Sequence, residues 1–254
     1  MSPSEQRWQT PPAVLTLSSQ DVHVWRISLE PDAEHVWCLR QLLAADETAR
    51  ADRFHFAKDR RHFIVARGAL RVILGRYLGL DPRHLAFSYS AYGKPALATA
   101  PAGDWLRFNI SHSHELALCA MTRGREVGID IEHIRANVSS EAIAERYFSP
   151  REVAALRALP ADLRRAAFFT CWTRKEAYIK ARGEGLSFPL DRFDVSLTPG
   201  EPAALLRTLG DPHEASRWTL QALAPGPGYI AALAVEGRDW QLACWQWPVA
   251  WSEP

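Results

Sequence analysis

The sequence predicts an α+β fold made of two similar halves, and three observations support it. Hydrophobic residues make up 47% of the 254 residues, which is enough for an ordinary core. Strand and helix patterns follow one another twice in the same coarse order, with a strand first, helices next and several strands last. A turn at Gly124-Arg125 separates the two series. We therefore expect an N-terminal half over residues 1–124 and a C-terminal half over residues 125–254.

The first half opens with a Pro- and Ser-containing lead-in over residues 1–20. Residues 22–27 alternate between apolar and polar and predict the first strand. A short helix is expected over residues 33–46.

A longer helical region begins near residue 46, breaks near Lys58-Asp59 and resumes to residue 78, where Gly79 is a suitable stop. Its second part carries an apolar stripe typical of a helix that packs on a core. We expect its bases to form mostly a solvated face, from which one or two could reach an anion: Arg50, Arg53, Arg60, Arg61, Arg67 and Arg71.

A short strand over residues 85–89 leads into a turn over residues 91–95. Lys94 in this turn is either a solvent-facing residue or a fixed cation beside a ligand, since Gly93 allows close backbone approach. The next strands are expected over residues 106–111 and 116–121.

The polar run Ser111-His112-Ser113-His114 closes the first of these strands. Asn, Ser and His side chains at a strand end can hydrogen-bond phosphate oxygens. Two histidines at this spacing also fit a metal site or a hydrolase. The sequence lacks a G-x-S-x-G elbow, which disfavours a serine hydrolase.

Residues 126–134 alternate between apolar and polar and predict a strand with Asp130 and Glu132 on one face. Two carboxylates one pleat apart repel each other. The pair therefore indicates either a bound cation or a fully solvated face, and spacing alone does not choose between them. Mg²⁺ suits such a pair because it takes a few carboxylates and completes its shell with water and phosphate.

Helices are expected over residues 139–147, 150–158 and 163–181, followed by four strands. On the longest helix Glu176 and Lys180 are four residues apart and share a face. Taken alone, they could be an exposed ion pair. The four strands are predicted over residues 193–197, 218–223, 229–235 and 240–247.

Composition narrows the class of protein. The formal net charge of +1 argues against a general nucleic-acid binder. No apolar run approaches membrane-spanning length, and the first residues lack the apolar region of a signal peptide. The four widely spaced cysteines form no metal or disulfide motif, so free thiols in a reducing cytoplasm are expected: Cys38, Cys119, Cys171 and Cys244.

Four stretches, taken in order, resemble one family. They are Tyr92-Gly93-Lys94-Pro95, Asn109-Ile110-Ser111-His112-Ser113, Gly128-Ile129-Asp130-Ile131-Glu132 and Trp172-Thr173-Arg174-Lys175-Glu176-Ala177-Tyr178-Ile179-Lys180. The chain resembles a 4′-phosphopantetheinyl transferase of the surfactin-synthetase-activating type. The resemblance implies two pseudo-symmetric α+β halves with the active site in the cleft between them. It also implies transfer of the phosphopantetheine arm of coenzyme A to a carrier-protein serine, with release of adenosine 3′,5′-bisphosphate.

The resemblance assigns roles to the acidic residues. Asp130, Glu132 and Glu176 match the Mg²⁺ ligands, and the metal would clamp the pyrophosphate of coenzyme A and neutralise its charge as the phosphoanhydride breaks. Glu176 also matches the general base for the serine, for which Glu132 or a metal-bound water is an alternative. Lys180 would contact the pyrophosphate.

The coenzyme A contacts follow from the same resemblance. Ser111 and His112 match phosphate-contacting positions, and Asn109 lies on the same strand end. Lys94 and Pro95 match the adenine and 3′-phosphate side of the pocket.

The basic helix matches the family less closely. Arg67 aligns with a coenzyme A-binding arginine of some relatives and Arg50 with a lysine of others. His62 stands where some members have arginine, so the individual 3′-phosphate contacts stay open.

The expected partners are coenzyme A and acyl, peptidyl or aryl carrier proteins, without nucleic acid or membrane. A chain that contains both halves of the cleft needs no second subunit, so a cytoplasmic monomer is expected. Two alternatives stay open. One is a binding module that holds coenzyme A or a carrier without catalysis, and the other is a metal-dependent phosphohydrolase that cleaves the same pyrophosphate with water.

Overall fold

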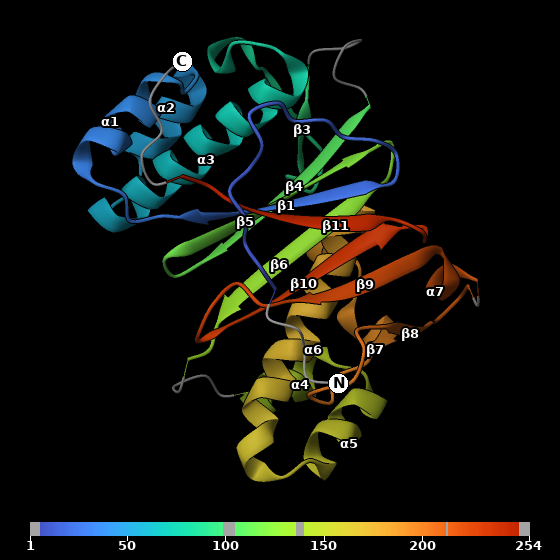
Figure 1. Ribbon diagram of the computed structural model, residues 1–254. Helices are drawn as coiled ribbons and strands as arrows, with labels where there is room; N and C mark the ends of the chain where they lie inside the picture. Colours follow the sequence, from blue (N-terminus) through green and yellow to red (C-terminus); the bar gives the residue numbers. More distant parts are fainter. Residues whose placement is uncertain (1–5, 99–104, 136–139, 212, 249–254) are drawn as a thin grey trace.

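The computed structural model describes residues 6–98, 105–135, 140–211 and 213–248 and confirms an α+β fold (Figure 1). The lead-in residues 1–5 and residue 139 of a predicted helix lie outside the described residues. The first half contributes β1 (Asp21–Ser28), α1 (Ala33–Gln41), α2 (Ala45–Asp52), α3 (Ala57–Leu78), a 3₁₀ turn (Pro82–His84), β2 (Phe87–Tyr89), β3 (Pro95–Leu97), β4 (Leu106–Ser113) and β5 (Leu116–Arg123).

The second half contributes a comparable series, with one long helix against a sheet. Its elements are β6 (Val127–His133), α4 (Ser140–Tyr147), α5 (Pro150–Ala158), α6 (Ala161–Arg182), two 3₁₀ turns (Gly185–Ser187 and Leu190–Arg192), β7 (Phe193–Val195), β8 (Leu205–Thr208), α7 (Glu214–Arg217), β9 (Trp218–Leu223), β10 (Tyr229–Glu236) and β11 (Gln241–Gln246).

The first sheet has the strand order β11-β1-β5-β4 and is buried on both faces. Successive side chains of a strand point to opposite faces. On β1, Trp25 and Ile27 belong to the core shared with α3, whereas Val22 and Val24 belong to a core shared with the second sheet. Figure 1 shows α1–α3 at one end of the molecule and α4–α6 at the other, with the sheets between them.

The second sheet has the order β6-β10-β9 and repeats this two-faced pattern. Ile129 and Ile131 of β6 join the core between the two sheets. Their neighbours Asp130 and Glu132 therefore point to the opposite face of β6, as the alternation predicts. β6 also lies beside β4, where the backbone N–H of Ile129 donates to Oδ1 of Asn109 at 2.9 Å.

Gly128 brings α6 unusually close to β6. A Cβ atom at this position would lie 2.1 Å from the carbonyl oxygen of Ala177 and 2.3 Å from the backbone nitrogen of Ala181. Only glycine fits without moving the helix, because both neighbours are backbone atoms. The glycine of the G-x-D-x-E stretch therefore determines how near the residues of α6 come to the acidic strand.

Gly128→Ala is expected to destabilise the protein by about 1–3 kcal/mol, the usual range for overpacking a tight contact. Urea unfolding measures the loss. Adding Ala181→Gly to this variant should restore nothing, since the clash is with backbone atoms. Recovery in the double variant would show that a side chain causes the crowding.

The helix boundaries in the first half differ from prediction. The predicted helix over residues 33–46 ends at Gln41, and α2 then begins at Ala45. The break expected at residues 58–59 lies at residues 53–56 instead, and Asp59 sits in the first turn of α3. A negative side chain is favourable at that end of a helix, and the segment has no Gly or Pro to mark the break.

The second half also departs from prediction in its last strands. β8 was not predicted, and β11 leaves the second sheet to pair in parallel with β1. The division at residues 124 and 125 therefore stays a prediction about the chain, while the first sheet takes one strand from beyond it.

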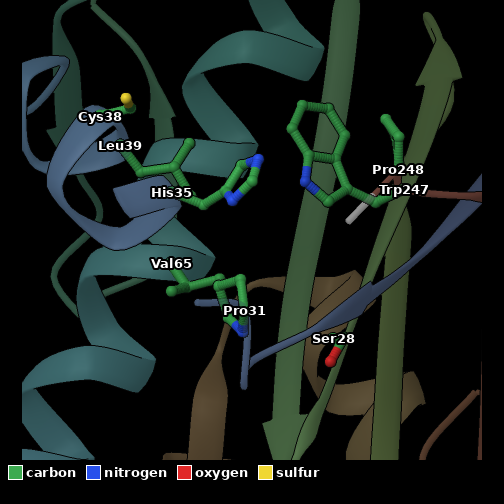
Figure 2. A pocket seen from close by; sticks show the side chains of 8 residues that line it. All are labelled: Ser28, Pro31, His35, Cys38, Leu39, Val65, Trp247 and Pro248. Atoms are coloured by element: carbon green, nitrogen blue, oxygen red, sulfur yellow. The ribbon is translucent and has the colours of Figure 1, made fainter. Parts of the chain in front are cut away.

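The described residues include no helix that could span a membrane, and a cavity beside α1 is small. Among the described residues, no helix has both the length and the apolar character needed to cross a bilayer. An enclosed cavity beside α1, lined by residues that include Cys38 and Trp247, measures about 10 Å³ (Figure 2). That is room for about one water molecule, so this cavity does not hold a substrate.

Candidate active site

Asp130, Lys180 and Ser111 meet where β6, α6 and β4 come together. The Lys180 ammonium donates to Asp130 Oδ1 at 2.6 Å and to Ser111 Oγ at 3.0 Å. The Ser111 hydroxyl donates to the same carboxylate oxygen at 2.9 Å. Three separately predicted site residues therefore form one cluster, and the protein partner of Lys180 is Asp130.

Glu132 continues the acidic face of β6. Its Oε2 accepts a hydrogen bond from the Ser113 hydroxyl at 3.0 Å, and Arg135 lies 3.7 Å away. Burial and then the nearby Asp130 charge raise the pKa of Glu132, which Ser113, Arg135 and Lys180 partly oppose. Ser113 was missed as a site residue. The period of two along β4 could have identified it, since Asn109, Ser111 and Ser113 share one face.

Glu176 reaches the same cluster from α6. Burial raises the pKa of this carboxyl to about 7, the Lys180 charge lowers it, and the Asp130 and Glu132 charges raise it further. The Asp130 and Glu132 charges therefore lie close enough to Glu176 to disfavour its ionisation. A carboxyl with a pKa near neutral can take up or release a proton at physiological pH.

The acidic cluster has unfilled capacity for a cation. Asp130 Oδ2 is buried and has no hydrogen-bond partner in the described structure. A buried, unpaired carboxylate oxygen is costly, and a hard cation such as Mg²⁺ is a natural partner for it. The described residues nevertheless contain no ready-made group of three or more His, Cys, Asp or Glu ligands. The donor chemistry fits Mg²⁺, while Lys180 partly neutralises Asp130.

The ion pair with Lys180 changes the effect on stability that we expect from removing the Asp130 carboxylate. Repulsion between Asp130 and Glu132 alone would make Asp130→Ala neutral or stabilising in the metal-free protein. Removing this carboxylate also removes the acceptor of both Lys180 and Ser111. We therefore expect the variant to lose about 1–2 kcal/mol of stability, as for other partly buried charged hydrogen bonds. Urea unfolding in EDTA tests this, and a variant as stable as the wild type would favour the repulsion account.

His112 lies beside the cluster, and only part of the residue reaches the surface. Loss of hydration lowers its pKa, and the neighbouring charges of Lys180 and His62 lower it further. His62 on α3 is bound to Glu30, with Nε2 2.7 Å from Oε1. Charged residues of both halves therefore act on the His112 ring.

Asn109 has a structural contact. Its side-chain oxygen accepts a hydrogen bond from the backbone N–H of Ile129 in β6, so Asn109 connects β4 to β6.

The Lys94 ammonium donates to Glu126 Oε2 at 3.0 Å and to the Ala181 carbonyl oxygen at 3.1 Å. Pro95 begins β3 and pairs with Tyr89.

The basic helix is less solvated than the sequence suggests. Arg67 and Arg71 are buried and both pair with Glu47, with Arg71 Nε 2.6 Å from the carboxylate. The Arg67 guanidinium also donates to the Tyr89 hydroxyl. The expectation of a solvated face is wrong for these two residues because α2 supplies a buried acidic partner. Arg50 is exposed and lies over the Phe63 ring.

Comparisons with known proteins show the family of this chain. A family model described as "4′-phosphopantetheinyl transferase, N-terminal" matches residues 27–123, and one described as "4′-phosphopantetheinyl transferase superfamily" matches residues 126–241. The chain is 43% identical over 240 residues to the 4′-phosphopantetheinyl transferase HetI of Nostoc sp., covering 94% of this chain and 98% of that protein.

More distant relatives carry related names. The chain is 32% identical over 197 residues to the 4′-phosphopantetheinyl transferase Sfp of Bacillus subtilis, covering 78% of this chain and 84% of that protein. It is 28% identical over 207 residues to the human L-aminoadipate-semialdehyde dehydrogenase-phosphopantetheinyl transferase, covering 76% and 67% of the two chains. These matches confirm the resemblance found in the sequence, and the chain belongs to the 4′-phosphopantetheinyl transferase superfamily.

Proposed function

We propose that this protein transfers the 4′-phosphopantetheine arm of coenzyme A to a serine hydroxyl of an apo carrier protein in a Mg²⁺-dependent reaction. The observation that carries the proposal is that the Lys180 ammonium of α6 and the Ser111 hydroxyl of β4 meet the Asp130 carboxylate, with Glu132 on the same face of β6. Such a cluster of carboxylates and a cation suits a substrate that brings both a metal ion and a pyrophosphate.

Asp130, Glu132 and Glu176 would hold the metal. When bound, Mg²⁺ supplies positive charge that offsets the charge developing on the pyrophosphate. Lys180 already has two hydrogen-bond acceptors in the cluster, and phosphate oxygens of the substrate can replace them. Its side chain is 27% exposed, so it is open to a ligand on one side.

Glu176 is our proposed general base. A base works best when its pKa lies near the operating pH, and the pKa of Glu176 is raised to about 7. In the proposed step the serine oxygen forms a bond to the β-phosphorus of coenzyme A as its proton passes to Glu176. The bond from that phosphorus to the bridging oxygen breaks, and adenosine 3′,5′-bisphosphate leaves. Glu132, whose pKa is also raised, is the alternative base.

The remaining predicted residues are proposed coenzyme A contacts. Ser111 and His112 lie beside the carboxylates that we propose as metal ligands, and both would contact phosphate oxygens. Asn109 is proposed as their support on β4. Arg50, Arg67 and Pro95 are proposed for the nucleotide side. Lys94 was expected there too, but its ammonium contacts two groups of the protein itself.

The test is to incubate the protein with coenzyme A, Mg²⁺ and a panel of apo acyl, peptidyl and aryl carrier proteins and to measure carrier mass. Gain of the phosphopantetheine mass on at least one carrier is expected, and EDTA should abolish it. No gain on any carrier would contradict the proposal. Release of adenosine 3′,5′-bisphosphate without a carrier would instead indicate a hydrolase. A cytoplasmic monomer is part of the proposal, and sedimentation analysis tests its oligomeric state.

A further inference from the structure

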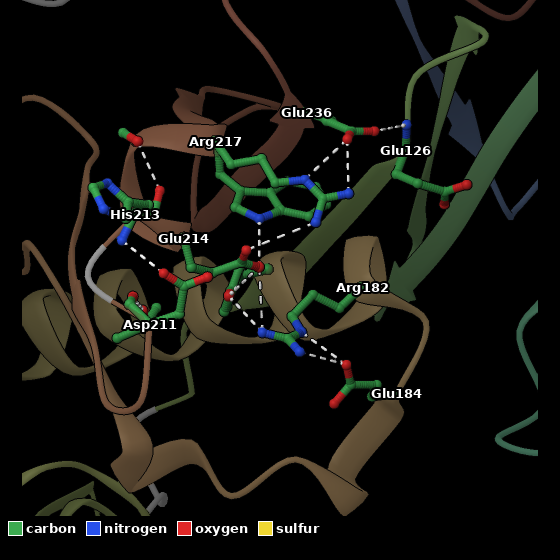
Figure 3. A network of polar contacts seen from close by, with 12 residues as sticks. Glu126, Arg182, Glu184, Asp211, His213, Glu214, Arg217 and Glu236 are labelled. Atoms are coloured by element: carbon green, nitrogen blue, oxygen red, sulfur yellow. Dashed lines mark hydrogen bonds and ion pairs between the residues drawn. The ribbon is translucent and has the colours of Figure 1, made fainter.

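A chain of polar contacts runs from Arg182, at the C-terminal end of α6, to Glu126 (Figure 3). On one side, Tyr178 and Arg182 of α6 donate to Glu214 Oε1 at 3.1 and 3.3 Å. The other carboxylate oxygen of Glu214 lies 3.7 Å from Arg217. Glu214 is 11% exposed, so solvent screens these contacts only in part.

The chain of contacts continues from Arg217 to the start of β6. Arg217 donates to Glu236 Oε1 at 3.0 and 2.8 Å through two nitrogens. The second oxygen of Glu236 accepts the backbone N–H of Glu126 at 3.3 Å. Figure 3 shows Glu126 at the far end of this chain of contacts from Arg182.

Lys94, from the first half of the molecule, links Glu126 at the end of this chain of contacts back to α6. Its ammonium joins the Glu126 carboxylate to the carbonyl oxygen of Ala181, at 3.0 and 3.1 Å. The last carbonyls of a helix have no partner within the helix, and a cation there is also favoured by the helix dipole. Lys94 therefore satisfies a terminal carbonyl of α6 one residue after Lys180. Two of the three ammonium hydrogens are used in this way.

Two glycines with positive φ follow α6 beside this contact. Gly183 has a φ of +78°, and a Cβ atom there would lie 3.6 Å from Lys94 Cδ. Gly185 has a φ of +56° and faces Tyr92 Cβ in the same way, at 3.4 Å. The positive φ favours glycine at both positions, and both lie beside the turn that carries Lys94.

We propose that Lys94 is a positioning residue that fixes the C-terminal end of α6, and with it Lys180, against the acidic strand. The inference rests on the proposed function only in that Lys180 is taken to serve the transfer reaction. It differs from a role in binding the nucleotide because the ammonium acts on two groups of the protein itself. Glu126 shares this role, since its other oxygen lies 3.3 Å from Arg107 of β4.

The kinetic test compares Lys94→Met, Glu126→Gln and the double variant in carrier modification, using coenzyme A and 3′-dephospho-coenzyme A. We expect Lys94→Met to lower kcat about tenfold, as slight misplacement of a reacting group can. Glu126→Gln should lower kcat by less, and the double variant should be no worse than Lys94→Met. The preference for coenzyme A over its dephospho form should stay as in the wild type.

A different kinetic pattern would overturn the inference. If Lys94 acts by contacting the 3′-phosphate, Lys94→Met would raise KM for coenzyme A alone, keep kcat and lose the preference for the 3′-phosphate. Glu126→Gln would then behave as the wild type. Carrier modification by the wild type tests the proposed function separately from this comparison of variants.

Hydrogen exchange provides a readout that does not depend on activity. The backbone N–H of Gly183 donates to Ile179 and Lys180 carbonyls at the end of α6. We expect exchange over residues 179–183 to speed up at least threefold in Lys94→Met and in Glu126→Gln. The control is Glu145→Gln, which removes a carboxylate from an exposed ion pair with Arg157 and should change neither exchange nor activity. Unchanged exchange in both test variants would refute the positioning role, and Glu126→Gln keeps the test valid if Lys94→Met fails to fold.

Discussion

Glu176→Gln is expected to reduce carrier modification at least 100-fold and, at the same time, to stabilise the metal-free protein above neutral pH. The loss of activity follows from removing both a proposed metal ligand and the proposed general base, of which a base alone contributes about 10²–10⁴-fold. The gain in stability follows from removing a buried carboxyl whose ionisation the fold disfavours.

The stability gained by Glu176→Gln is expected to increase as the pH rises. Burial, together with the Asp130 and Glu132 charges, raises the pKa of Glu176 from 4.5 to about 7, against the opposing effect of Lys180. A group with a raised pKa contributes stability that is complete below its unfolded pKa and is lost as the pH rises through its folded pKa. Wild-type stability should therefore fall between about pH 5 and pH 8 relative to Glu176→Gln, by about 2 kcal/mol.

The measurement is the free energy of urea unfolding of both proteins in EDTA at pH 5 and pH 8.5. Excess Mg²⁺ at pH 8.5 should then stabilise the wild type and have a smaller effect on Glu176→Gln. Two results would count against this account: a difference between the proteins that does not change with pH, or an equal response of both to Mg²⁺.

The acidic strand and the long helix could be predicted because their signals are local. A period of two puts Asp130 and Glu132 on one face of a strand, and a spacing of four puts Glu176 and Lys180 on one face of a helix. Which face meets which depends on Gly128, whose missing side chain lets two backbones touch. The ion pair between Lys180 and Asp130 is a consequence of that contact, and neither stretch reveals it alone.

The features that could not be predicted depend on partners that are distant in sequence. Arg71 lies on a helix that seemed solvated, yet Glu47, 24 residues earlier, draws it into the core. β11 reads as a strand of the second half, but its register with β1 is set by packing between segments some 220 residues apart. A local pattern carries no information about such partners.

Lys175 is the clearest case, and it yields the second large effect. It stands beside Glu176 in a run of charged residues, yet its side chain is fully buried. The ammonium lies 2.8 Å from Glu152 of α5 and donates to the carbonyl oxygens of Leu190 and Phe193 at 2.7 and 2.6 Å. Lys175 thus connects α6 to α5 and to the segment that leads into β7.

Lys175→Met is expected to destabilise the protein by about 3–5 kcal/mol, because it leaves the Glu152 carboxylate buried without its cation. Adding Glu152→Gln should recover part of this loss, since the neutral amide removes the unpaired charge and keeps an oxygen for the Val195 N–H that Glu152 accepts at 2.8 Å. Arg165→Met, at an exposed position on the same helix, is the matched control and should stay within about 0.5 kcal/mol of the wild type. Urea unfolding of the four proteins decides the matter. If Lys175→Met is as stable as the control, or if Glu152→Gln deepens the loss, the buried pair does not hold α6 in the way its geometry indicates.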